Sequence, residues 1–153
     1  MIDLQNLGKY TENNRIEAKK AVGGLPKSVW ETYSAFANTL GGVILLGVEE
    51  LEDKTLSPVL LADPEDLIEE FKAILNNPQK VSLNILADED IKVEHSKGYK
   101  IVVINVPQAK PHQKPVYIDN NPYTGTYRRN GDGDYKCTRS QVKSMLEKAF
   151  SQN

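Results

Sequence analysis

This 153-residue chain has very little cysteine and no long apolar run. Its one cysteine, Cys137, cannot form an internal disulfide, and no spacing of cysteine and histidine indicates a metal site. No segment approaches the roughly 18 consecutive apolar residues that a membrane-spanning helix requires. The first residues also lack the basic-then-apolar order of a signal peptide. These absences argue against a disulfide scaffold and a membrane protein, and we expect a cytoplasmic protein.

The composition is that of an ordinary globular domain, with 39% hydrophobic and 26% charged residues. We therefore expect one domain over residues 1–153, either alone or as the N-terminal part of a longer regulator. The overall charge of −2 conceals a polarity. Residues 1–96 hold 9 Lys and Arg against 17 Asp and Glu, which gives −8, and residues 97–153 hold 10 against 4, which gives +6. Such asymmetry can indicate a polyanionic partner, unless the two halves interleave in the fold.

Residues 27–48 form the stretch around which the chain is organised. Apolar residues at three- and four-residue steps predict a helix over residues 27–40. Gly41 and Gly42 can close its C-terminus, since glycine readily adopts the left-handed conformation. The apolar run that follows predicts a strand over residues 43–50, containing Gly47, that is buried on both faces. Asn38, in the last helical turn, is expected to bond the turn backbone rather than a ligand.

The remaining patterns predict a mixed sheet with about three helices, an α/β (α+β) fold. Asp63 and Pro64 begin a second predicted helix that ends at residue 75. A capping box from Thr138 to Gln141 begins a third, with an apolar face at Val142 and the residues after it. Strands are predicted at residues 15–19, 56–61 and 81–85, in a hairpin of residues 91–95 and 99–106, and as a pair of residues 115–118 and 125–129.

Several short motifs resemble the Schlafen-type AlbA-like domain, a family described as DNA-binding. The resemblance covers residues 12 to about 150, and its specific part is Ala-Phe-Ala-Asn-Thr-Leu-Gly-Gly at residues 35–42. Weaker motifs in the expected order are Glu17-x-Lys19, Leu25-Pro26, Leu46-Gly-Val48, Val106-Pro107, Pro115-Val-Tyr117, and Tyr127-x-Arg129-x-Gly131. The family was once described as a divergent ATPase. No Gly-Lys-Ser/Thr phosphate loop occurs here, and Gly41-Gly42 precedes a strand instead of following one.

The resemblance implies a nucleic-acid-binding domain, of DNA or RNA, that acts in transcription regulation and pairs as a homodimer. Basic and aromatic residues in the last third of the chain fit that function, since cations neutralise phosphates and aromatic rings stack on bases. Arg128 and Arg129 should face opposite sides of a strand, and Arg129 matches the family's arginine, so we expect Arg129 in the binding patch. The candidate nucleic-acid-binding residues are Lys110, Lys114, Tyr127, Arg128, Arg129, Lys136 and Arg139.

A metal-dependent RNase is the alternative function. Glu12, Glu17 and either Glu49 or Glu50 match the acidic trio of RNA-cleaving members of the family. Clustered carboxylates can hold Mg²⁺ or Mn²⁺, which activates water, and Lys19 could neutralise developing phosphate charge. Glu17 and Lys19 could equally form a simple salt bridge on one strand. A third alternative is a module that binds a small ligand or a protein and no nucleic acid.

Overall fold

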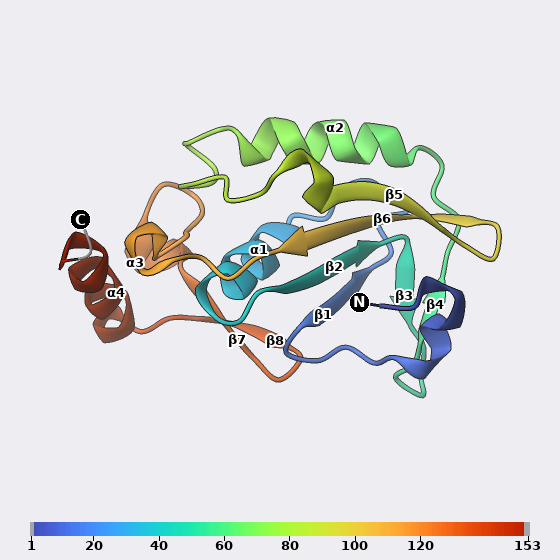
Figure 1. Cartoon of the computed structure of the whole chain (residues 1–153), viewed down its shortest axis with the longest axis horizontal. Helices are drawn as coiled ribbons and strands as arrows, with labels where there is room; N and C mark the ends of the chain where they lie inside the picture. Colours follow the sequence, from blue (N-terminus) through green and yellow to red (C-terminus); the bar gives the residue numbers. More distant parts are fainter. Residues whose placement is uncertain (1, 152–153) are drawn as a thin grey trace.

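The computed structural model describes residues 2–151 and is built around one four-stranded sheet (Figure 1). Strand β1 runs parallel to β2, and β6 and β5 continue the sheet in antiparallel pairing, in the order β1-β2-β6-β5. The four strands are β1 (Ile16–Lys19), β2 (Gly42–Leu46), β5 (Ile91–Ser96) and β6 (Tyr99–Val106). Two small antiparallel sheets are added, β3 (Val48–Glu50) with β4 (Leu56–Pro58), and β7 (Tyr127–Asn130) with β8 (Gly133–Lys136). The predicted mixed sheet is confirmed.

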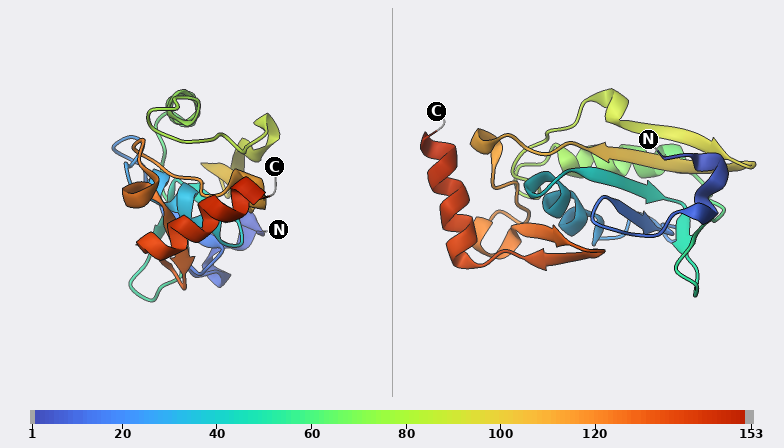
Figure 2. Two further views of the ribbon diagram at one scale, coloured as in Figure 1. Left: turned by 90° about the vertical axis from the view of Figure 1, so that its left-hand side faces the viewer. Right: turned by 60° about the horizontal axis from the view of Figure 1, so that its bottom comes forward.

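The helices cover the sheet and close one end of the molecule. The α-helices are α1 (Val29–Asn38), α2 (Pro64–Leu75), the short α3 (Pro122–Gly125) and α4 (Arg139–Ser151), and the 3-10 helices are η1 (Leu4–Lys9), η2 (Asp88–Asp90) and η3 (Pro111–Gln113). Figure 2 shows α4 beside α3 and the β7–β8 hairpin at the same end. No helix within residues 2–151 is long and apolar enough to cross a membrane.

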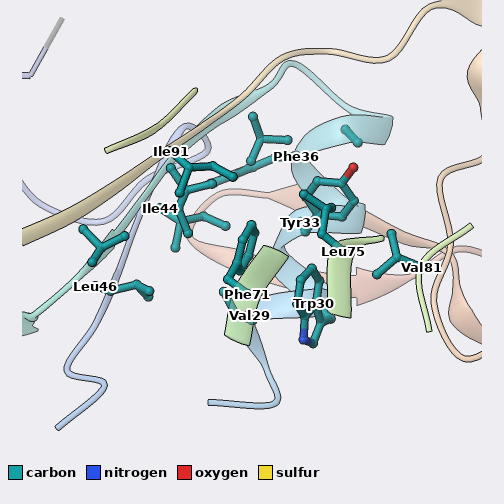
Figure 3. Packing of buried hydrophobic residues seen from close by; sticks show 14 of the residues in the cluster. Val29, Trp30, Tyr33, Phe36, Ile44, Leu46, Phe71, Leu75, Val81 and Ile91 are labelled. Carbon is teal, nitrogen blue, oxygen red and sulfur yellow. The ribbon is translucent and has the colours of Figure 1, made fainter. Parts of the chain in front are cut away.

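The main core lies between α1, α2 and one face of the sheet. Trp30 of α1 stacks on Phe71 of α2, with ring centroids 4.6 Å apart, and meets Tyr33 edge-on at 5.9 Å (Figure 3). Ile44 of β2 faces this core, and Leu45 faces a second core beneath η1. Both residues are fully buried, so the predicted burial of this strand on two faces is confirmed.

Glycines determine where β2 begins and ends. Gly41 has a φ of +76° and donates to the Phe36 carbonyl at 2.8 Å, which closes α1. A Cβ on Gly42 would lie 2.9 Å from both the Arg15 carbonyl and the Phe36 ring, so only glycine fits between them. Gly47 has a φ of +91° and divides the single strand predicted over residues 43–50 into β2 and β3.

Three local predictions were wrong. Residues 81–85 form an isolated bridge from Val81 to Ile118 and no strand, because Leu83 O and Ile85 N bond the Tyr33 hydroxyl at 2.8 and 3.1 Å. Residues 115–118 meet 125–129 only at the Tyr117–Thr126 bridge, and β7 pairs with β8 instead. In α4 only Val142 is fully buried, and Phe150 is 84% exposed.

Candidate functional site

Arg129 connects the β7–β8 hairpin to the N-terminal part of the chain. Its side chain is fully buried, and all five of its N–H groups donate hydrogen bonds. Nη1 bonds Glu17 at 2.9 Å and Asp134 at 2.7 Å, while Nε and Nη2 bond the carbonyl of Asn13, and Nη2 also bonds that of Ile16. Burial lowers the pKa of Arg129, but the hydrogen bonds and charges of Asp134 and Glu17 outweigh it, and the pKa is raised. The guanidinium is therefore a fixed internal cation.

This arrangement corrects the prediction that Arg129 belongs to an exposed binding patch. Arg129 and its cross-strand partner Asp134 lie on the face of the hairpin that packs on α1, and the guanidinium lies 4.9 Å from the Phe36 ring centroid. We call this the inner face of the hairpin. Arg128 and its partner Tyr135 lie on the outer face, because side chains alternate along a strand. The arginine that matches the family motif is thus the one that a phosphate cannot reach.

Asn38 holds the same hairpin from the end of α1. Its Nδ2 donates to the carbonyls of Val116 and Tyr127 at 2.8 and 3.1 Å, and its Oδ1 accepts from Val116 N at 2.9 Å. Ser34, one turn earlier, donates to the Val116 carbonyl and accepts from Tyr127 N. The prediction that Asn38 bonds the backbone of the glycine turn is therefore wrong in its partners, which are the distant backbone groups of Val116 and Tyr127.

Three carboxylates meet where the hairpin turn approaches the N-terminal segment. Glu12, Glu50 and Asp132 each place an oxygen atom within 4.8 Å of the other two, and we call them the carboxylate cluster. Burial, followed by the charge of Glu17 and then weaker effects that include Glu50, raises the pKa of Glu12 to about 7. Glu12 is held in place by a hydrogen bond of 3.1 Å from Ala18 N to its Oε2. The cluster thus concentrates three carboxylates, of which Glu50 is also paired with Lys54 at 3.7 Å.

The predicted acidic trio converges only in part. Of the two alternatives, Glu50 joins Glu12, and Glu49 lies on the other face of β3, paired with Lys20 at 3.7 Å. Glu17 adjoins Glu12 but is engaged by Arg129. Lys19 lies 3.6 Å from Glu17 and donates to Ser28 Oγ at 3.0 Å, so it forms the salt bridge considered above.

The donor set of the carboxylate cluster fits a divalent cation. Mg²⁺ and Mn²⁺ take oxygen ligands, commonly carboxylates and water. Burial first, and the neighbouring negative charges after it, disfavour the ionised form of Glu12, and a bound cation would favour that form. Glu12, Glu50 and Asp132 are the residues that would hold the ion.

A group of cations lies at the two ends of η3 and along α4. These elements pack together at the left end of Figure 1, and we call their cations the basic end: Lys110, Lys114, Arg139, Lys143 and Lys148. Burial and the charge of Lys148 lower the pKa of Lys114, so these two lysines lie close to each other. No acidic side chain among residues 2–151 forms an ion pair with any of the five.

The other predicted basic and aromatic residues occupy the hairpin. Arg128 lies 5.8 Å from the centroid of the half-exposed Tyr135 ring, and its Nε is buried without a hydrogen-bond partner among the described residues. Lys136, at the end of β8, is exposed. Tyr127 packs against the main core, and burial raises its pKa, followed by the charges of Glu31, Asp119 and Asp134. Tyr127 is therefore partly buried by its contact with the core.

Two acidic residues were missed by the sequence reasoning. Asp132 lies in the β7–β8 turn and Asp134 on β8, within a segment that we interpreted only as a turn. A signal for Asp134 was present, because a hairpin register that opposes it to Arg129 follows from a two-residue turn at Gly131. Nothing local indicated that Asp132 would meet Glu12 and Glu50.

Comparisons with known proteins define the class to which this α+β domain belongs. The sequence matches the profile of the Schlafen, AlbA_2 family over residues 12–138. The chain belongs to this family.

Solved structures support the same assignment. The solution structure of the N-terminal domain of a RecG-related protein from Nitrosomonas europaea, which is named for an ATP-dependent DNA helicase, is 30% identical with a TM-score of 0.65. The match covers 90% of this chain and 95% of that domain. The DIP2311 protein of Corynebacterium diphtheriae shares the fold at 14% identity and a TM-score of 0.54, over 87% of this chain and 27% of that one. No curated protein sequence matches at a significant level.

Proposed function

We propose that this chain is a nucleic-acid-binding domain whose contact surface is the basic end. The observation that carries the proposal is the separation of charge in the fold. Five lysines within residues 1–96 pair with carboxylates of the same segment, at 3.6–3.7 Å. No acidic side chain within residues 2–151 pairs with the basic end. Unpaired, clustered cations favour a polyanion, because they release counterions from its phosphates. The relationship to a domain of a protein named for a DNA helicase agrees with this function.

The test is the salt dependence of binding to labelled DNA and RNA. We expect affinity to fall steeply as salt rises and to be unaffected by a chelator. The double variant Lys143→Glu and Lys148→Glu, both exposed on α4, should weaken binding and reduce the salt slope by about 2. The matched control is Lys97→Glu with Lys100→Glu, exposed at the β5–β6 hairpin at the other end of Figure 1. Absence of binding by the wild-type protein would favour a module for a small ligand or a protein.

Homodimer formation and a role in transcription regulation in the cytoplasm belong to the same proposal. The incompletely buried apolar face of α4 supports a dimer, since Met145, Leu146 and Ala149 are half-buried and Phe150 is 84% exposed. Light scattering should then give about twice the 17.1 kDa mass of one chain. A mass of 17.1 kDa at all concentrations would contradict the dimer.

A metal-dependent RNase is the second candidate, favoured by the convergence of Glu12, Glu50 and Asp132. Bound Mg²⁺ or Mn²⁺ would supply an activated water. Lys19, directed at Glu17, is less available to a phosphate than we predicted.

Cleavage of RNA in the presence and absence of Mg²⁺ or Mn²⁺ tests this candidate. Glu50→Gln and Asp132→Asn should each abolish cleavage and weaken Mn²⁺ binding, since each removes one carboxylate ligand. Glu49→Gln is the matched control, one residue away on the opposite face of β3, and it should retain both. Equal loss of cleavage in Glu49→Gln and Glu50→Gln would contradict the assignment of the metal site to the carboxylate cluster. Cleavage that continues in the presence of a chelator would also contradict it.

A further inference from the structure

Two exposed tyrosines each have an arginine against the ring. Arg139 lies 4.5 Å from the ring centroid of Tyr123, and Arg128 lies 5.8 Å from that of Tyr135. The tyrosines are 38% and 50% exposed. Burial of apolar area does not account for these positions, in contrast to Tyr33, which is fully buried in the core.

The two pairs lie on adjoining segments. Tyr135 and Arg139 are four residues apart, so their Cα atoms are at most about 14 Å from each other. Tyr123 is on α3, which packs against α4. Burial raises the pKa of the Cys137 thiol and the charge of Arg128 opposes that shift, so Arg128 also lies close to the segment that links β8 to α4. The outer face of the hairpin therefore adjoins the basic end.

Both rings remain exposed, and that of Tyr135 is also held in position by the backbone. The Tyr135 ring rests against the backbone of Gly133, where a Cβ would come within 2.8 Å of the ring and its hydroxyl. The arginine of each pair has no carboxylate partner among residues 2–151, unlike Arg129. A guanidinium fixed against an aromatic ring can still donate its N–H groups to a phosphate.

From this arrangement we infer that the domain selects single-stranded nucleic acid, with one base stacked on Tyr123, another on Tyr135, and phosphates bound by Arg139 and Arg128. The inference rests on the proposed nucleic-acid binding and specifies its ligand. Base–aromatic stacking requires a base whose face is free. Bases inside a duplex present only their edges, so a duplex can satisfy the arginines but not the tyrosines.

The test compares a labelled single strand with the duplex of the same sequence, as DNA and as RNA, at one salt concentration. The wild-type protein should bind the single strand more tightly. Tyr135→Ala and Tyr123→Ala should each weaken single-strand binding by about 5- to 150-fold, the range found for loss of one stacked base, and change duplex binding much less. Tyr135→Phe should retain wild-type affinity, because the stacking ring remains.

Tyr99→Ala is the matched control, since Tyr99 is a 37% exposed tyrosine on the β5–β6 hairpin. It should leave affinity unchanged, and circular dichroism checks that each variant is folded. Equal wild-type affinity for single strand and duplex would overturn the inference while leaving nucleic-acid binding intact, as would tyrosine variants with unchanged affinity. A wild-type protein that binds neither form at low salt would overturn the proposed function as well.

Discussion

The two faces of the β7–β8 hairpin carry adjacent arginines with opposite surroundings. Arg129, on the inner face, gives all five N–H groups to carboxylates and carbonyls and is 5% exposed. Arg128, on the outer face, contacts the half-exposed Tyr135 ring and has no ion pair with an acidic side chain of residues 2–151. The comparison shows that a motif arginine can be fully engaged by the fold while its neighbour in the sequence forms no ion pair within residues 2–151. It also explains how one short hairpin contributes to a carboxylate cluster through its turn and to a basic surface through its outer face.

The largest expected difference is in stability, between the methionine variants of the two arginines. Arg129→Met leaves Asp134 nearly buried without its cation and Glu17 with Lys19 alone, and we expect it to lower the free energy of unfolding by about 3–5 kcal/mol. Arg128→Met should change it by less than about 1 kcal/mol, because no buried partner is lost. Urea unfolding measures both. Similar losses of stability in the two variants would contradict the distinction between the faces.

The variant Asn38→Leu tests whether the β7–β8 hairpin depends on α1 for its position. Asn38→Leu leaves the Val116 N–H and the carbonyl of Tyr127 without their partner, and should lower the free energy of unfolding by about 2–3 kcal/mol. Its affinity for nucleic acid should change little under conditions where it remains folded. Asn105→Leu, on an exposed position of β6, serves as the control. A folded Asn38→Leu variant that has lost all binding would instead give Asn38 a role in ligand contact.

The smallest expected effect concerns the carboxylate cluster below the inner face. The pKa of Glu12 is about 7 in the folded protein and 4.5 by reference, so the folded state binds this proton more tightly than the unfolded state does. Stability from this group is fully present below pH 4.5 and is lost as the pH rises to about 7.

Glu12→Gln should remove that dependence. We expect the free energy of unfolding of the variant to exceed that of the wild type by about 1 kcal/mol at pH 8 and to equal it at pH 4. The expected gain is small because solvent screens a half-exposed carboxyl. Urea unfolding at the two pH values checks the difference. Glu49→Gln, which removes a carboxylate outside the cluster, should show no such change, and a gain that is equal at both pH values would contradict the assigned cause.

Much of the fold was predictable because local signals agreed with tertiary structure. The helix of residues 27–40, its glycine closure and the doubly buried β2 follow from apolar spacing and from backbone conformations that glycine favours. The capping box at Thr138 is formed as predicted, with hydrogen bonds of 2.8 and 3.1 Å. Predictions failed where the partner was distant, as at residues 81–85, whose backbone bonds the Tyr33 hydroxyl instead of a strand.

The site was less predictable than the fold, for the same reason. Glu12 and Glu50 were named from a family pattern, but Asp132 joins them only because Arg129 and Asn38 fix the hairpin that carries it. Alternation along β7 correctly separated Arg128 from Arg129, yet it could not say which of them faces solvent. That choice depends on how the hairpin packs on α1, which no local pattern encodes.

Mapping of the contact surface by NMR tests the central claim most directly. A ¹⁵N-labelled sample of this 17.1 kDa chain would be titrated with a single-stranded oligonucleotide, and amide shifts followed residue by residue. We predict that the largest shifts fall in β7, β8 and α4, with α2 and the β5–β6 hairpin unaffected. Shifts concentrated on α2 or on the β5–β6 hairpin would contradict the account.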